Sequence, residues 1–176
     1  MSTKKICIFY FSGTGFTGYV AKRLARELES RQIDVDCFKM ENTQAGSIDM
    51  SGYEAAGIFY PIHSFNAPRI VIKFIRQLPK TDGLSTFVVS TGGEDSKLNY
   101  ASSDLLIKIL NRKGYKVFYN RLVEMPSNFM VKYDDERVKR IIDKAKDDVI
   151  NIAQDITEEK QYFLKKNKTA KTNVVL

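Results

Sequence analysis

The feature that most constrains this chain is an apolar strand that runs directly into a loop of small and hydroxylated residues. Residues 6–11 read ICIFYF, residues 12–17 read SGTGFT, and apolar residues then recur at helical spacing from 19 to 30. Such a loop binds anions, because the first N–H groups of a helix have no intrahelical partner and the helix dipole favours negative charge. The sequence therefore predicts a phosphate site in this loop. Its donors would come from Ser12, Gly13, Thr14, Gly15, Phe16 and Thr17.

The composition of this loop narrows the kind of phosphate that it would bind. Residues 12–17 contain no lysine, whereas the P-loop of nucleoside triphosphate sites ends in Lys followed by Ser or Thr. Residues 13–18 match the dinucleotide pattern G-x-G-x-x-G, and Asp34, Asp36 and Glu41 lie in the region of its ribose-binding acid, so a dinucleotide is not excluded. Hydroxyl side chains without a cation favour one terminal phosphate, bound by amides and hydroxyls.

The rest of the chain alternates strand patterns with helical patterns. Alternation of this kind predicts an α/β fold in which a parallel sheet is covered by helices on both faces. We expect one domain over 1–156 and a basic tail over 157–176. Strands are predicted at 6–11, 33–38, 55–60, 85–90 and 115–123. Helices are predicted at 19–30, 68–78 and 134–156, with another that carries Leu98, Ala101, Leu105 and Ile109 and ends before Gly114.

Loops at 12–17, 61–66 and 91–100 each follow a predicted strand. The carboxyl ends of parallel strands lie at one edge of a sheet, and ligands of open α/β sheets bind at that edge. The second and third loops would therefore form walls for a ligand whose phosphate lies in the first.

These loops resemble those of the flavodoxin family. The motifs are S-G-T-G-F-T at 12–17, Y-P-I-H-S-F-N-A-P-R at 60–69 and S-T-G-G-E at 90–94. The sequence looks most similar to the subgroup in which a flavodoxin-like domain is fused to a C-terminal ferredoxin, and M-P-S-N-F at 125–129 resembles that subgroup too. The resemblance covers residues 4–156. It implies a flavodoxin-like, doubly wound, five-stranded parallel sheet in the order 2-1-3-4-5, with FMN as cofactor.

The resemblance also implies a place around FMN for each loop. The FMN phosphate would be bound by Ser12, Gly13, Thr14, Gly15, Phe16 and Thr17. One side of the isoalloxazine ring would be lined by Pro61, Ile62, His63, Ser64, Phe65 and Asn66. The pyrimidine edge would be read by Thr91, Gly92, Gly93 and Glu94, and the other side closed by Asn99 and Tyr100. We expect no residue to act as acid, base or nucleophile, and none to bind a metal.

As a flavodoxin, the chain would carry electrons between redox partner proteins. It would take them from a reductase or a ferredoxin-type donor and pass them to an acceptor enzyme, with the flavin supplying the redox chemistry. The alternative is an FMN-dependent oxidoreductase on the same fold, of the quinone reductase or protoporphyrinogen oxidase type. A module that binds another phosphate ligand is a third hypothesis.

Three features depart from an ordinary flavodoxin. The net charge is +7, from 28 basic and 21 acidic residues, whereas flavodoxins are typically acidic. The chain has no tryptophan, and its 61–66 loop has no glycine. A positive surface can steer an acidic partner, nucleic acid or an anionic membrane. No aromatic platform is interleaved with the basic residues, so a specific nucleic-acid partner is not predicted.

Hydropathy and cysteine content bear on the cellular compartment. No apolar run approaches the ~20 residues of a transmembrane helix, and residues 1–5 lead straight into a strand without a signal-peptide pattern. We therefore expect a cytoplasmic protein without a transmembrane segment. Cys7 and Cys37 lie in strand-like runs and are expected to be buried as small hydrophobes. Two thiols are too few to ligate an iron–sulfur cluster within this chain.

Overall fold

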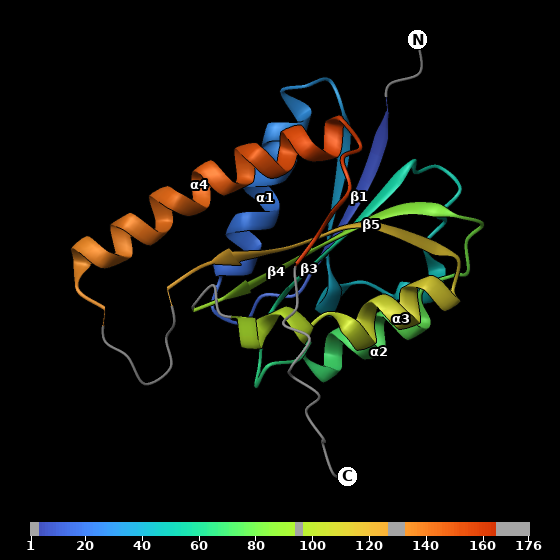
Figure 1. The fold of residues 1–176 in the computed structure, drawn as a ribbon. Coiled ribbons are helices and arrows are strands. Elements are labelled where there is room, and N and C mark those ends of the chain that lie inside the picture. Colours follow the sequence, from blue (N-terminus) through green and yellow to red (C-terminus); the bar gives the residue numbers. More distant parts are fainter. Residues whose placement is uncertain (1–3, 94–96, 127–132, 165–176) are drawn as a thin grey trace.

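The computed structural model describes residues 4–93, 97–126 and 133–164 and contains a parallel β-sheet with helices on both faces (Figure 1). The strand order is β2-β1-β3-β4-β5-β6, and each pairing is parallel. The strands are β1 (Lys5–Tyr10), β2 (Asp34–Lys39), β3 (Ala55–Pro61), β4 (Leu84–Gly92), β5 (Tyr115–Glu124) and β6 (Tyr162–Phe163). Helices α1 (Phe16–Glu29) and α4 (Asp135–Thr157) cover one face, and α2 (Arg69–Gln77) and α3 (Asp104–Arg112) cover the other. The predicted α/β fold is confirmed.

The order of the strands creates a switch point at the carboxyl end of β1. From β1 the chain crosses to β2 on one side and then returns to β3 on the other. Tyr10 pairs with Lys39 of β2 and with Phe59 of β3, and the N–H of Phe11 donates to the carbonyl of Phe59 at 3.0 Å. In a doubly wound sheet, the crevice for a ligand opens where the strand order reverses in this way.

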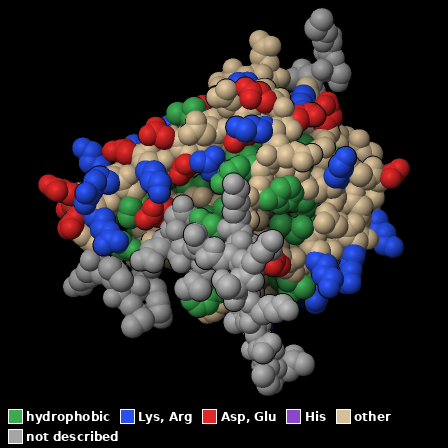
Figure 2. All heavy atoms as spheres, in the orientation of Figure 1, with side chains coloured by type: hydrophobic (Ala, Val, Ile, Leu, Met, Phe, Trp, Pro, Cys, Tyr) green, Lys and Arg blue, Asp and Glu red, His purple; other side chains and the backbone are tan. Residues whose placement is uncertain are grey.

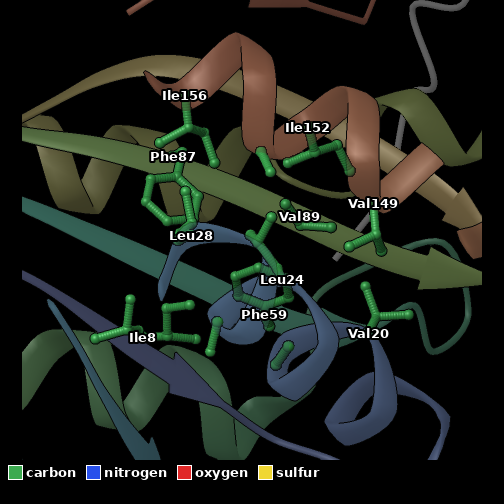
Figure 3. Packing of buried hydrophobic residues seen from close by; sticks show 14 of the residues in the cluster. Ile8, Val20, Leu24, Leu28, Phe59, Phe87, Val89, Val149, Ile152 and Ile156 are labelled. Atoms are coloured by element: carbon green, nitrogen blue, oxygen red, sulfur yellow. The ribbon is translucent and has the colours of Figure 1, made fainter. Parts of the chain in front are cut away.

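Successive side chains of each central strand point to opposite faces of the sheet and fill two hydrophobic layers. Ile6 and Ile8 point to the α1/α4 face, whereas Cys7 and Phe9 point to the α2/α3 face. Because both faces are buried, the central strands are apolar along their whole length, which is typical of parallel sheets. Figure 3 shows the first layer, formed by Ile8, Val20, Leu24, Leu28, Phe59, Phe87, Val89, Val149, Ile152 and Ile156.

The prediction of five strands is wrong, because β6 adds a sixth at the edge beside β5. Asp155 fixes the chain after α4: it accepts hydrogen bonds from Tyr119 Oη and Lys160 Nζ, each at 3.0 Å. The chain then runs along β5, and the Tyr162 ring lies 5.5 Å from that of Tyr119. A two-residue exposed strand has no hydrophobic periodicity that a sequence could reveal. This strand lies within 157–176, where the division into domain and tail stays a prediction.

One helix at the α2/α3 face differs from the predicted one. The helix expected to carry Leu98 and Ala101 is divided into a 3-10 helix, Lys97–Ala101, and α3, which begins at Asp104. Asn120 of β5 donates to Ser103 Oγ at 2.7 Å, and this buried contact holds the chain at the start of α3. Between β2 and β3, the structure has short 3-10 helices at Met40–Asn42 and Ala45–Ser47.

The two cysteines have different surroundings. Cys7 is fully buried, as predicted, but Cys37 is exposed because β2 is the edge strand of the sheet. Burial raises the pKa of the Cys7 thiol to about 12, and partial desolvation of the Cys37 sulfur, with the nearby Glu29 carboxylate, raises the pKa of Cys37 as well. The thiolate is the reactive form, so Cys7 is protected both by burial and by its protonation state.

We expect a thiol reagent such as Ellman's reagent to modify Cys37 slowly in the folded protein and Cys7 only after unfolding. At mildly alkaline pH, the native chain should release one equivalent of chromophore and the denatured chain two, one for each cysteine. Cys37→Ser should abolish the native reaction. A native Cys37→Ser chain that still reacts would contradict the burial of Cys7.

Within the described residues, no helix combines the length and hydropathy that crossing a bilayer requires. The same part of the chain contains no cluster of three or more His, Cys, Asp or Glu side chains that is placed to hold a metal ion.

Candidate functional site

Four segments from distant parts of the sequence meet at the carboxyl edge of the sheet and form one open cleft. The cleft has a volume of about 340 Å³. It is lined by residues of the 12–17 loop, of the carboxyl ends of β3 and β4 with the residues directly after them, and of the segment that follows β5. These residues are Thr14, Phe16, Thr17, Pro61, Ile62, His63, Thr91, Gly92, Gly93, Met125 and Pro126.

The 12–17 loop delivers the N-terminus of α1 to this cleft. Gly15 is the N-cap residue and has φ +96°, a left-handed conformation that glycine adopts without steric cost. Among the described residues, no side chain caps the helix, and its first turn contains no acidic residue. The first N–H groups of α1 therefore lack both an intrahelical acceptor and a side-chain acceptor.

Ser12 has an unusual environment within this loop. Its Oγ is shielded from water and has no hydrogen-bond partner in the described part of the chain. A Cβ built on Gly18, in the first turn of α1, would lie 3.5 Å from Ser12 Oγ, so this hydroxyl faces the start of the helix. A buried polar group without a partner costs free energy, and an acceptor bound in the loop would remove that cost.

Hydrogen bonds connect the loops to one another. Thr17 Oγ1 and Thr91 Oγ1 lie 2.8 Å apart in a buried contact between α1 and β4. The N–H of Ile62 donates to the carbonyl of Thr91 and the N–H of Met125 donates to the carbonyl of Gly92, both at 2.8 Å. The loops after β3, β4 and β5 thus extend the sheet ladder, so their backbones are held in fixed relative positions.

The 61–66 loop ends in a tight turn despite its lack of glycine. His63 and Asn66 exchange two backbone hydrogen bonds of 2.9 and 3.0 Å, and the residues between them, Ser64 and Phe65, have φ of +48° and +63°. Positive φ at both central positions is the geometry of a type I′ turn, which normally uses Asn and Gly. Each of these residues stores roughly 1–2 kcal/mol of backbone strain.

The cleft has few charged groups. None of the described residues that line it is Lys, Arg, Asp or Glu, and His63 is its titratable side chain. Tyr60, at the end of β3, is fully buried, and burial raises the pKa of its phenol well above the usual range, so this group stays neutral. Recognition of an anion at this site must therefore rest on backbone N–H groups and hydroxyls.

Comparison with known proteins agrees with this geometry. The family model described as "Flavodoxin domain" matches residues 7–132. The chain belongs to the flavodoxin family. Members of this family bind FMN at the switch point between the first and third strands, which is where the cleft lies. Curated protein sequences give no match.

Solved flavodoxin structures share the fold at low sequence identity. Oxidised flavodoxin 2 from Bacillus cereus is 20% identical, with a TM-score of 0.66, over 88% of this chain and 99% of that one. The two-electron reduced flavodoxin of Megasphaera elsdenii is 22% identical, with a TM-score of 0.58, over 81% and 98%. A flavodiiron core from Synechocystis is 16% identical, with a TM-score of 0.56, over 88% of this chain. The chain spans 37% of that longer protein.

Half of the eighteen residues that the flavodoxin resemblance places around FMN line the cleft. Those that line the cleft are Thr14, Phe16, Thr17, Pro61, Ile62, His63, Thr91, Gly92 and Gly93. Five more belong to the same loops without lining it: Ser12, Gly13, Gly15, Ser64 and Phe65. Asn66 instead lines a neighbouring groove, and Asn99 and Tyr100 lie in the 3-10 helix without lining the cleft. Glu94 lies outside the described residues.

Two cleft residues were not among those predicted to bind the cofactor. Met125 and Pro126 follow β5 and line the cleft. Their position at a strand's carboxyl end, within the M-P-S-N-F motif, was the signal that could have placed them there. The rest of that motif lies outside the described residues.

Proposed function

We propose that this chain binds FMN in the cleft and carries electrons between redox partner proteins. The observation that carries the proposal is the unpartnered Ser12 hydroxyl beside the uncapped N-terminus of α1. Donors without acceptors at a helix N-terminus suit a phosphate. The fixed loops after β3 and β4 supply flanking walls for a ring attached to that phosphate.

Each group of residues has a distinct task in this proposal. Backbone N–H groups and hydroxyls of Ser12–Thr17 would hold the phosphate, and Pro61–Asn66, Thr91–Glu94, Asn99 and Tyr100 would contact or enclose the ring. Bound FMN would supply the redox chemistry, while the protein sets orientation, solvent access and potential. The Thr17–Thr91 bond keeps the phosphate loop and the ring-binding loop at a constant separation.

A comparison of FMN with riboflavin tests this function directly. We expect the chain, freed of flavin, to bind FMN roughly 100-fold or more tightly than riboflavin, because riboflavin lacks the group that α1 and Ser12 would hold. Quenching of flavin fluorescence during titration measures both dissociation constants. Equal affinities would place the flavin elsewhere, and no binding of either flavin would favour a different phosphate ligand.

The enzymatic alternative has one observation in its favour. Met125 and Pro126 give the cleft a further wall, as a substrate pocket beside the flavin would require. Sustained consumption of NADPH by the FMN-loaded chain with a quinone would indicate the oxidoreductase. A carrier, in contrast, should exchange electrons stoichiometrically with a partner protein. The M-P-S-N-F motif also supports membership of the ferredoxin-fused subgroup, which we propose together with a cytoplasmic location.

A further inference from the structure

The outer surfaces of α2 and α3 carry a concentration of positive charge. Arg69, Lys73 and Arg76 recur along α2 at i, i+4 and i+7, and Lys108 and Arg112 lie one turn apart on α3. All five are exposed, and we call them the α2–α3 basic face. Figure 2 shows Lys and Arg side chains gathered over this part of the molecule, at the lower right of the view.

Within the described ranges, this positive charge lacks paired carboxylates. None of the five side chains forms an ion pair with another described residue. Asp104 is the one acidic residue within the two helices. On the opposite face of the sheet, by contrast, Glu27 pairs with Arg23 and Arg31 of the α1 region. A surface with uncompensated charge of one sign attracts partners of the other sign.

The α2 part of the basic face borders a groove with an apolar component, whereas Lys108 and Arg112 do not line it. The groove has a volume of about 490 Å³ and is lined by Arg69, Lys73 and Arg76 of α2 and by Leu105 of α3. Leu105 is 51% exposed. Exposed apolar side chains with a charged rim are the usual composition of protein–protein contact surfaces. This composition suits contact with a protein.

The groove shares a structural element with the proposed flavin site. Asn66 lines the groove, His63 lines the cleft, and two backbone hydrogen bonds join these residues in the same tight turn. Phe65 of that turn is 57% exposed. A protein docked in the groove would therefore lie against the loop that we place along the flavin ring, as close approach between redox centres requires.

We propose that the α2–α3 basic face docks an electron-carrier protein with an acidic surface, such as a ferredoxin. The proposal rests on the proposed function, because it assumes a redox partner. A membrane is less favoured, because the apolar stripe of α2 (Val71, Phe74 and Ile75) is buried against the sheet and cannot insert. A nucleic acid is less favoured, because the groove lining contains no aromatic side chain on which bases would stack.

Charge reversal on the face tests this docking surface. The variant Arg69→Glu/Lys73→Glu/Arg76→Glu is compared with the control Lys22→Glu/Arg26→Glu/Arg140→Glu, whose positions are exposed on α1 and α4 over the opposite face. Each reversal changes the charge by two, so both variants go from +7 to +1. Reduced acidic [2Fe–2S] ferredoxin is mixed with each FMN-loaded chain in a stopped-flow instrument at salt concentrations from about 20 to 300 mM.

We expect the wild-type bimolecular rate constant to fall with salt, and the α2 variant to be at least about tenfold slower at low salt. The control should stay within about threefold of wild type. Equal slowing in both variants would show that net charge, not this face, steers the partner, and would overturn the proposal. An unchanged rate in the α2 variant would overturn it as well.

A second measurement separates this proposal from the proposed function. Calorimetric titration of the same ferredoxin into the FMN-free chain should show binding that the α2 variant loses and the control keeps. FMN titration of every variant is done in parallel, so failure to bind FMN is recognised as failure of the proposed function alone. Tight binding of single-stranded RNA or of phosphatidylserine vesicles, lost in the α2 variant while ferredoxin binding stays unchanged, would reassign the face and overturn the proposal.

Discussion

Ser12→Ala is expected to weaken FMN binding by roughly 10- to 100-fold and to change riboflavin binding by less than about twofold. The size of the effect follows from the charge of the proposed acceptor, because a hydrogen bond to an ionised group contributes about 1.5–3 kcal/mol. Riboflavin has no phosphate, so it forms no such hydrogen bond and its affinity should not depend on Ser12. Fluorescence titrations of FMN and riboflavin with the wild type and with Ser12→Ala give four dissociation constants. Together they form a thermodynamic cycle that isolates the contact between the Ser12 hydroxyl and the phosphate.

In the flavin-free chain, Ser12→Ala should not destabilise the fold, although it weakens FMN binding. Ser12 Oγ is buried without a partner in the described part of the chain, so its removal should leave the free energy of unfolding unchanged or raise it by up to about 1 kcal/mol. A structural serine would show the reverse, with lower stability when the hydroxyl is lost. Urea unfolding of the flavin-free chain distinguishes the two.

Ser90→Ala is the matched control. Ser90 Oγ is also buried without a partner in the described residues, but Ser90 lies within β4 and not in the 12–17 loop at the start of α1. It should resemble Ser12→Ala in stability and the wild type in FMN affinity. If Ser12→Ala weakened riboflavin binding as much as FMN binding, or weakened neither, the phosphate would not lie against Ser12.

The parts of the fold that the sequence predicts are those determined by long apolar patterns. The α1 stripe of Val20, Ala21, Leu24 and Leu28 is buried throughout, because residues at this spacing share one face of a helix. The run at 55–60 is likewise fully buried within β3. In such segments burial against the sheet outweighs every local preference, so pattern and structure agree.

The parts that the sequence does not predict depend on contacts between distant residues. Strand β6 forms because Asp155 and Tyr119 position the chain after α4, and neither residue carries a local strand signal for it. The start of α3 depends on the contact of Ser103 with Asn120, across the α3–β5 interface. Cys37 is exposed because its strand is at the edge of the sheet, and the strand order that implies this position comes from the flavodoxin resemblance and not from hydropathy.

The candidate site likewise has features that the sequence predicts and features that it does not. The rule that ligands bind at the carboxyl ends of strands predicts which loops meet, and they do line one cleft. It does not predict that Ser64 and Phe65 adopt positive φ, because the turn lacks the Asn-Gly signal of its type. That conformation is imposed by the paired backbone bonds of His63 and Asn66, which a sequence does not display.

Gly114→Ala is expected to lower the free energy of unfolding by about 3–5 kcal/mol, the largest stability effect that we predict. Gly114 follows α3 with φ +86°, and a Cβ built there would overlap the carbonyl oxygen of Thr81. The neighbouring chain has little freedom to move, because the N–H of Gly83 donates to the carbonyl of Gly114 at 2.8 Å and that of Thr81 donates to the carbonyl of Lys113 at 2.9 Å. Backbone strain of roughly 1–2 kcal/mol adds to the steric cost.

Urea unfolding of the flavin-free chain measures this loss, with Gly52→Ala as the control. A Cβ built on Gly52 would have no heavy atom within 4 Å, and Gly52 does not have positive φ, so its substitution should change stability by less than about 1 kcal/mol. Equal effects at both positions would mean that the turn at 81–83 yields to the new methyl group. Gly114 lies just before β5, at the amino edge of the sheet, whereas the cleft is at the carboxyl edge. The Gly114→Ala chains that remain folded should therefore bind FMN with wild-type affinity, because the strain is confined to the edge opposite the site.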